Sequence, residues 1–400
     1  MPVLPLSQPA DPRSQAKFFT TLLLLWLAGV ALRLTILAVP PLIPLIHDQL
    51  KLNATQIGIL TGLPSMLFAI AAVPGSLLIA RLGVRTALVV GLAVTAIGGA
   101  LRGAIPDVAW LYAMTIAMGA GVAVMQVTMP PAVRTWIPER IGFATAVYTN
   151  GLIIGEILPV ALMVLVLPLV AGSWQWGFVV WSVPVAVIAI LVLTMAPASA
   201  NGPVTAARRR WWPDWNSPLI WRLGIMLGTI NAIYFATNAF LPDYLRSNGQ
   251  SDWINAALTG LNGGQLPASA LLLAVAGRLE RKAWPYVVCG LLCVIATGGI
   301  VYGAGAWVVA AATLQGFAAS AILILILALP PLLSAPDDVH RVTAAMFTIS
   351  YSCAVIVPVI SGLMWDLSGI ASLAFAPIAI CGIILVTLAP AINHVRQASA

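Results

Sequence analysis

The sequence predicts an all-α integral membrane protein: twelve transmembrane helices in two pseudo-symmetric six-helix halves, with both termini in the cytoplasm. The apolar composition, the spacing of the apolar runs and an internal repeat predict this fold. Of the 400 residues 61% are apolar and 8% are charged, and the mean hydropathy is +1.01. Soluble domains are about 25% charged, so this chain could not cover a water-facing surface.

Twelve apolar runs are long enough to cross a bilayer, whose core takes about 20 residues of helix. The first run is too long for a cleaved signal peptide and is not followed by a small-residue cleavage site. The predicted spans are 18–46, 55–80, 86–105, 108–131, 141–168, 175–196, 218–245, 253–277, 284–303, 307–333, 342–366 and 370–390.

The distribution of basic residues predicts the orientation of these spans. With the N-terminus in the cytoplasm, the outer ends carry only Lys51, Arg102 and Arg246, and Arg33 lies within a span. The other basic residues of the 19 Lys and Arg then fall at inner ends, as the positive-inside rule requires. An odd number of spans would destroy this alternation.

The chain repeats itself across a hydrophilic linker at residues 197–217, which includes Arg208, Arg209 and Arg210. Met129-Pro130-Pro131 corresponds to Leu329-Pro330-Pro331, at an offset of about 200 residues, and each repeat contains six spans. We therefore expect a cytoplasmic tail (1–17), an N-terminal half (18–196), a linker (197–217), a C-terminal half (218–390) and a second tail (391–400).

The loop after the second span carries a recognisable motif, Ser76-Leu77-Leu78-Ile79-Ala80-Arg81-Leu82-Gly83-Val84-Arg85. Arg81, Gly83 and Arg85 resemble the signature of the major facilitator superfamily, although Ala80 stands where that family usually has Asp. The resemblance covers the whole chain. It implies a secondary transporter that works by alternating access around one midplane cavity.

Three stretches resemble the cyanate and 2-nitroimidazole permease (CynX/NimT) branch of that superfamily. One is Arg33 within the first span, followed by the Pro-rich exit 39–44. The others are residues 52–64 and residues 130–149.

Arg33 is the most informative residue of the chain. It lies near mid-membrane, where a charge costs on the order of 3 kcal/mol. Because Arg stays protonated, it must face water, a counter-ion or a substrate, and its planar fork suits small anions. Arg33 is therefore predicted to bind the anionic group of a substrate; the alternative is an ion pair that only fixes helix packing.

Glu156 is the acidic residue nearest mid-membrane, and it shares a helix face with Tyr148 and Leu152. If Glu156 meets Arg33, its protonation would release Arg33 to hold an anion, which would give proton–anion symport. A purely structural partner of Arg33 is the alternative.

The remaining predicted site residues are neutral. Asn231, Tyr234 and Asn238 share one face of the seventh span, and Asn262 and Gln265 follow in the eighth. Such stripes indicate a cavity lining, although isolated amides also join helices. The full predicted substrate-binding set is Arg33, Tyr148, Gln126, Asn231, Tyr234, Asn238, Asn262, Gln265, Gln315 and Tyr351, with Glu156 for coupling.

A cytoplasmic gate is predicted from Arg81, Arg85, Arg134 and Glu139, which follow the second and fourth spans. Arg134 is expected to pair with Glu139 or with Asp337 or Asp338. In that arrangement Glu139 would substitute for the Asp that Ala80 replaces.

The predicted partners are a small anionic or polar solute, protons and the lipid bilayer, with no nucleic acid, cofactor or metal. His and Cys are not clustered and no P-loop is present, which argues against an enzyme and against ATP hydrolysis. A drug/proton antiporter for neutral or cationic compounds and a non-transporting receptor are the alternatives. We expect a monomer in a bacterial inner membrane.

Overall fold

The computed structural model describes residues 12–52, 54–197 and 211–390 and is all-helical in these ranges. Residues 1–11 of the first predicted tail, the whole second tail (391–400) and most of the predicted linker, including Arg208–Arg210, lie outside the described residues. The helices are α1 (Pro12–Leu37), α2 (Ile43–Leu50), α3 (Ala54–Leu101), α4 (Val108–Trp136), α5 (Ile141–Leu169), α6 (Trp174–Met195), α7 (Pro218–Ser247), α8 (Ile254–Gly263), α9 (Gln265–Leu279), α10 (Ala283–Tyr302), α11 (Ala306–Leu333), α12 (Val339–Ser368) and α13 (Ala376–Leu388).

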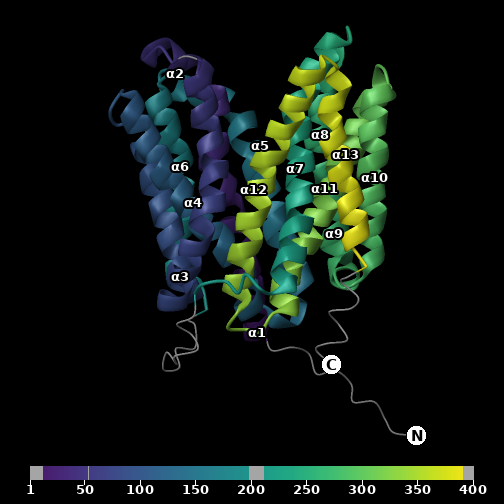
Figure 1. Ribbon diagram of the computed structural model, residues 1–400. Helices are drawn as coiled ribbons and strands as arrows, with labels where there is room; N and C mark the ends of the chain where they lie inside the picture. The colour runs from purple at the N-terminus through teal and green to yellow at the C-terminus, as the bar shows by residue number, and fades with distance from the viewer. Residues whose placement is uncertain (1–11, 53, 198–210, 391–400) are drawn as a thin grey trace, which may run out of the picture.

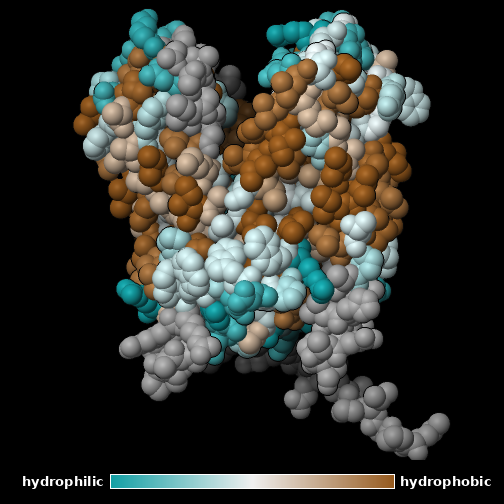
Figure 2. All heavy atoms as spheres, viewed as in Figure 1, coloured by the Kyte–Doolittle hydropathy of each residue, from teal (hydrophilic) through white to brown (hydrophobic). Residues whose placement is uncertain are grey.

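Helices α1–α6 and α7–α13 form two groups side by side (Figure 1). The start of α1 and the end of α13 lie at the same end of the molecule, here termed the lower end. Brown apolar side chains cover the middle of the molecule, and teal polar ones gather at its two ends (Figure 2). This distribution is that of a protein surrounded by lipid.

Ten helices among the described residues are long and apolar enough to cross a membrane, against twelve predicted spans. Two features account for the difference. Helix α3 has 48 residues and includes two predicted spans, which meet at Gly83 (φ 79°, ψ 166°), a conformation suited to glycine. Helices α8 and α9, with 10 and 15 residues, divide one predicted span at Gly264, so neither is long enough alone.

The first predicted span, 18–46, ends earlier than expected. Helix α1 stops at Leu37, and a short 3₁₀ turn (Pro40–Leu42) leads into α2. Pro40 has no N–H to donate to the Ile36 carbonyl, so Val39 N donates to it instead, at 3.2 Å. The helix therefore breaks at Pro40, four residues after Ile36, whose carbonyl would otherwise accept from residue 40.

The two groups of helices meet at the lower end and part at the upper end. Helix α12 packs against α3 and α4, and α5 packs against α9. Thr348 Oγ1 donates to Ala69 O at 3.0 Å, and Arg134 donates to Pro331 O. Figure 2 shows a cleft between the two groups that opens at the upper end.

Glu280 also joins the two groups. A Cβ added to Gly142, the second residue of α5, would lie 1.6 Å from Glu280 Oε2, so only glycine leaves room for this carboxylate. Burial raises the pKa of Glu280 to about 7, against the opposing attraction of Arg281. The carboxyl is thus placed at the N-terminal end of a helix of the other group.

Glu280 makes the stability of the protein depend on pH. Its pKa is about 7 in the folded chain against an ordinary value of 4.5, so the folded state binds more protons between these values. Glu280 should therefore lower the stability progressively as pH rises through this window. We expect the melting temperature of the Glu280→Gln variant to fall less over the same window than that of the parent protein. An identical pH profile for the two proteins would contradict this assignment.

Candidate functional site

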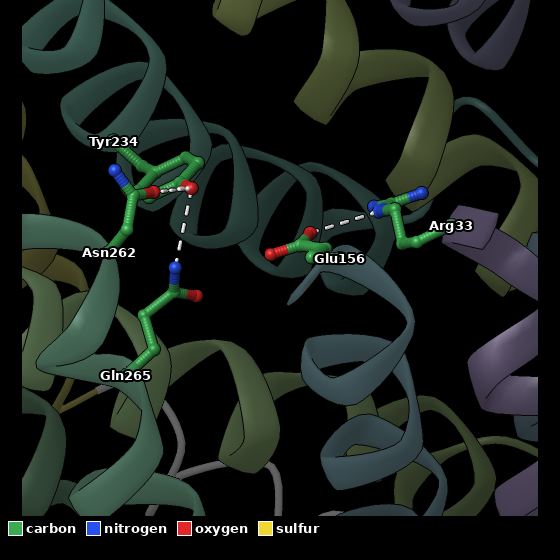
Figure 3. A network of polar contacts seen from close by, with 5 residues as sticks. All are labelled: Arg33, Glu156, Tyr234, Asn262 and Gln265. Atoms are coloured by element: carbon green, nitrogen blue, oxygen red, sulfur yellow. Dashed lines mark hydrogen bonds and ion pairs between the residues drawn. The ribbon is translucent and has the colours of Figure 1, made fainter. Parts of the chain in front are cut away.

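Arg33 of α1 and Glu156 of α5 form an ion pair, with Arg33 Nε 3.1 Å from Glu156 Oε1 (Figure 3). Their side chains are 13% and 24% exposed. Among the described residues, no group hydrogen-bonds Arg33 Nη1, which is buried. The pair thus leaves part of the guanidinium fork available to another acceptor.

The close approach of α1 and α5 brings these two residues together. A Cβ on Gly29 would lie 2.0 Å from Tyr148 O, and one on Gly155 would lie 2.2 Å from Val30 O. Gly151 meets Trp26 O in the same way. Small residues spaced by four allow helix backbones to touch in a membrane. The contacts place Arg33, one turn beyond Gly29, opposite Glu156.

Arg102 fixes the end of α1, although the sequence predicts it only as an outer-end charge. It is fully buried and donates through Nη2 to Thr35 O at 2.5 Å. The Val39 N–H that would have bonded Thr35 O is diverted to Ile36 O by the Pro40 break. Arg102 also lies 4.1 Å from the Phe178 ring centroid, a favourable cation–π distance. Arg102 therefore caps the broken helix two residues after Arg33.

An aromatic wall stands beside the ion pair. Arg33 Cζ lies 5.5 Å from the Phe68 ring centroid, and the Phe68 and Tyr351 rings are 4.8 Å apart. Phe347 stacks on Tyr351 at 6.0 Å. Tyr351, from α12, interacts electrostatically with both Arg33 and Tyr148. The predicted residues Arg33, Tyr148, Glu156 and Tyr351 are thus brought together, and Phe68 joins them without having been predicted.

A neutral polar cluster lies on the other group of helices (Figure 3). Tyr234 OH donates to Asn262 Oδ1 at 2.5 Å and accepts from Gln265 Nε2 at 3.3 Å. Asn262 Nδ2 donates to Asn238 Oδ1 at 3.2 Å. Tyr234 interacts electrostatically with Glu156 and Arg33, so the cluster faces the ion pair. The two predicted stripes on the seventh and eighth spans therefore form one surface.

Glycines also set the position of α8. Cβ atoms on Gly260 and Gly264 would lie 2.4 Å and 2.3 Å from Thr313 atoms, and one on Gly316 would lie 1.8 Å from Leu261 O. Helix α8 is therefore pressed against α11, with Asn262 on its exposed side.

Three predicted site residues are placed within helix contacts. Gln315 is fully buried and donates to Thr237 Oγ1 at 2.7 Å. Asn231 donates to Ser350 Oγ at 2.8 Å, which joins α7 to α12. Gln126 is buried, and no described group hydrogen-bonds its Oε1.

Asn150 is a polar residue near the site that the sequence analysis does not identify. Trp26 Nε1 donates to Asn150 Oδ1 at 3.0 Å, and Asn150 Nδ2 donates to Ser269 Oγ at 3.1 Å. This chain runs from α1 through α5 to α9 and so joins the two groups. In the sequence, Asn150 stands out as a polar residue in an apolar run. It directly precedes Gly151, the glycine that contacts α1.

Two of the predicted gate residues donate to backbone carbonyls, and the pairing of Arg134 with a carboxylate stays a prediction. Arg134 donates to the Pro331 carbonyl across the two groups, while Asp338 pairs with Arg341. Arg85 donates to Leu193 O within its own group. Arg81 and Glu139 are exposed. The carboxylate packed between the two groups at the lower end is Glu280.

No group of three or more His, Cys, Asp or Glu residues that could hold a metal ion occurs in the described ranges.

The Major Facilitator Superfamily sequence model matches residues 25–306. The chain belongs to this superfamily. It is similar to the cyanate transport protein CynX of Escherichia coli (strain K12), with 24% identity over 92% of this chain and 96% of that protein. It is also similar to the 2-nitroimidazole transporter of the same organism, with 24% identity over 89% of this chain and 91% of that protein.

Solved structures share the fold. The proton:xylose symporter XylE bound to 6-bromo-6-deoxy-D-glucose superposes with a TM-score of 0.74 over 93% of this chain and 95% of that chain, at 14% identity. The predicted resemblance to this family and branch is confirmed. The protein is a multi-pass transporter of the inner membrane and not an enzyme.

The α1–α5 contact gives a prediction about stability. Gly155→Ala places a Cβ 2.2 Å from Val30 O and should cost about 1–3 kcal/mol as the helices separate. The matched control is Gly298→Ala in α10, whose Cβ would have nothing within 4 Å. Because Ala favours helix by about 1 kcal/mol over Gly, the control should not lower the melting temperature. Equal losses in the two variants would rule out a special role for the close contact.

The ion pair gives a second prediction. Glu156→Gln leaves Arg33 without its counter-ion and should lower the stability by about 1–3 kcal/mol, less than the ~3–5 kcal/mol of a fully buried pair. The double variant Arg33→Gln/Glu156→Gln should lose less than the sum of the two single variants. Thermal unfolding of the four proteins measures this coupling. Additive losses would show that the two charges do not interact.

Proposed function

We propose that the protein is a secondary active transporter that moves a small anionic or strongly polar solute by alternating access. Arg33 binds the anionic group, and Glu156 couples transport to protons. The observation that carries this proposal is the Arg33–Glu156 pair at 3.1 Å, with Arg33 Nη1 free of other partners among the described residues.

Arg33 can exchange the Glu156 carboxylate for a substrate anion. While Glu156 is ionised, it occupies one edge of the guanidinium and competes with an anion for it. Protonation of Glu156 removes this competitor, so an anion binds Arg33 together with a proton. The charge of the site then stays the same on loading, which suits proton–anion symport.

The rest of the proposed site selects the shape of the solute. Phe68 and Tyr351 offer flat apolar faces beside Arg33, which suit a planar group. Tyr234, Asn238, Asn262 and Gln265 offer hydrogen bonds without charge from the opposite side. Cyanate and 2-nitroimidazole, the compounds named for two relatives, are both small and flat and both carry hydrogen-bond acceptors.

The chain crosses the membrane twelve times. Helix α3 makes two of these passes, and helices α8 and α9 together make one. The N-terminal half is 18–196, the linker 197–217 and the C-terminal half 218–390. The lower end, where α1 starts and α13 ends, is cytoplasmic because it carries most of the basic residues. The conformation is then open to the outside and closed toward the cytoplasm. A monomer suffices, since one chain supplies the whole proposed site.

A second candidate is export of neutral or cationic aromatic compounds in exchange for protons. The aromatic wall favours it, because Phe347, Tyr351 and Phe68 form a continuous stack. In this candidate Arg33 only neutralises Glu156.

Ligand-induced thermal stabilisation of the purified protein separates the two candidates. Cyanate, nitrate and formate should raise the melting temperature of the parent, and more at acidic than at neutral pH. Arg33→Gln should bind these anions about 10-fold or more weakly, since a hydrogen bond to a charged group contributes ~1.5–3 kcal/mol. Glu156→Gln should bind them with no dependence on pH.

Arg246→Gln is the matched control, because it removes an exposed arginine at the opposite end of α7 from the lower end. It should respond to the anions as the parent does. Stabilisation by lipophilic cations or neutral aromatics that persists in Arg33→Gln would overturn the anion site and favour the exporter. Anion-driven stabilisation that is insensitive to pH in the parent would remove the coupling role of Glu156.

A further inference from the structure

A cavity of about 780 Å³ lies at the lower end, and Arg33 is not among its lining residues. It is bounded by residues 211–217, the start of α7 and the connection between α11 and α12. The residues that give it chemical character are Trp211, Trp212, Asp214, Ser334, Asp338 and Arg341. None of them belongs to the proposed transport site.

The segment that forms one wall of this cavity is anchored at its start by two hydrogen bonds. Ser76 Oγ of α3 donates to Trp211 O at 2.9 Å, and Arg341 Nε of α12 donates to Trp212 O at 2.8 Å. The segment, teal in Figure 1, crosses the front of the lower end toward the start of α7. The Trp211 and Trp212 rings meet edge to face at 5.3 Å. One wall of the cavity is thus tied to both groups of helices, through Ser76 of α3 and Arg341 of α12.

The charges of the cavity favour a ligand that carries a cationic group. Arg341 pairs with Asp338, which leaves the Asp214 carboxylate in excess; its Oδ1 accepts from Asn216 N at 3.2 Å. A carboxylate beside two indole rings is a favourable environment for an ammonium group. The Arg341 guanidinium offers donors suited to a phosphate. Ser334 Oγ is buried without a hydrogen-bond partner among the described residues and adds a neutral donor.

The depth of the cavity points to lipid as the source of that ligand. Trp212 and Trp221 are 56% and 47% exposed, and the Trp215 and Trp221 rings lie 6.4 Å apart. Figure 2 shows a pale band below the brown apolar surface at the lower front. Exposed tryptophans concentrate where the bilayer meets water, at the level of the headgroups. The cavity therefore opens at headgroup depth.

We propose that this cavity binds the headgroup of a phospholipid with a primary ammonium, such as phosphatidylethanolamine. The ammonium lies against Trp211, Trp212 and Asp214, and the phosphate lies near Arg341. Because the wall of the cavity is tied to α3 and α12, a bound headgroup favours the conformation in which the lower end is closed. The proposal is independent of the transported solute.

The test uses the purified full-length protein in nanodiscs of phosphatidylglycerol alone or mixed with phosphatidylethanolamine. Phosphatidylethanolamine should raise the melting temperature, and native mass spectrometry should show it retained in preference to phosphatidylglycerol. Asp214→Asn and Trp212→Leu should remove both effects. Trp284→Leu, which removes an exposed tryptophan at the start of α10 outside the cavity, is the matched control and should keep them.

Three results would overturn the proposal. One is equal retention of the two lipids by the parent. Another is unchanged preference in both Asp214→Asn and Trp212→Leu. The third is stabilisation by soluble phosphoethanolamine in phosphatidylglycerol nanodiscs while phosphatidylethanolamine has no effect, which would assign the cavity to a water-soluble ligand.

Discussion

The ion pair between Arg33 and Glu156 is the interaction on which the rest of the transport site depends. An arginine deep in an apolar helix cannot lose its proton, so the fold must supply a counter-charge or water. Here α5 supplies the counter-charge, and it can do so only because glycines let its backbone touch α1. The break at Pro40 and the cap from Arg102 hold the end of α1 that carries Arg33. Packing, backbone geometry and charge therefore converge on one pair of side chains.

The two groups of helices contribute unlike chemistry to this site. The first group holds both charges, and the second faces them with a phenol and three amides that hydrogen-bond one another. A neutral cluster can rearrange its hydrogen bonds around different solutes at little electrostatic cost. In a transporter of this superfamily, such a division separates the group that fixes an anion from the surface that adapts to the rest of the solute.

At the lower end, backbone carbonyls accept hydrogen bonds from two of the predicted gate arginines. Arg134 bonds the Pro331 carbonyl, which lies in the last turn of α11, where helix carbonyls have no donor four residues further along the helix. Glu139 is exposed, and Glu280 from the other group packs against Gly142 instead. The end of α11 and the glycine thus provide an acceptor and a space, and neither carries a charge that a sequence pattern would reveal.

The amino-acid sequence determined the membrane class, the family and the identity of the charged residues. These follow from composition, from short motifs and from the cost of a charge in lipid, all of which are local properties. It also predicted that Tyr234 and Asn238 share a face of one helix and that Asn262 and Gln265 share a face of the next, because helical periodicity aligns them. The roles of Asn150, Phe68 and Arg102 could not be predicted in this way. Each role depends on which helix packs opposite, and the type of a single residue in an apolar run does not identify that helix.

Only the tertiary structure decided that Arg33 meets Glu156 and that Gln315 and Asn231 bond to other helices. Helix crossings are set by many weak contacts between small residues, and a shift of one turn would separate the charged pair. The sequence therefore determined which chemistry is present in the membrane, whereas the packing of α1 on α5 and of α8 on α11 decided which groups meet, because distance and burial arise only when helices are placed side by side.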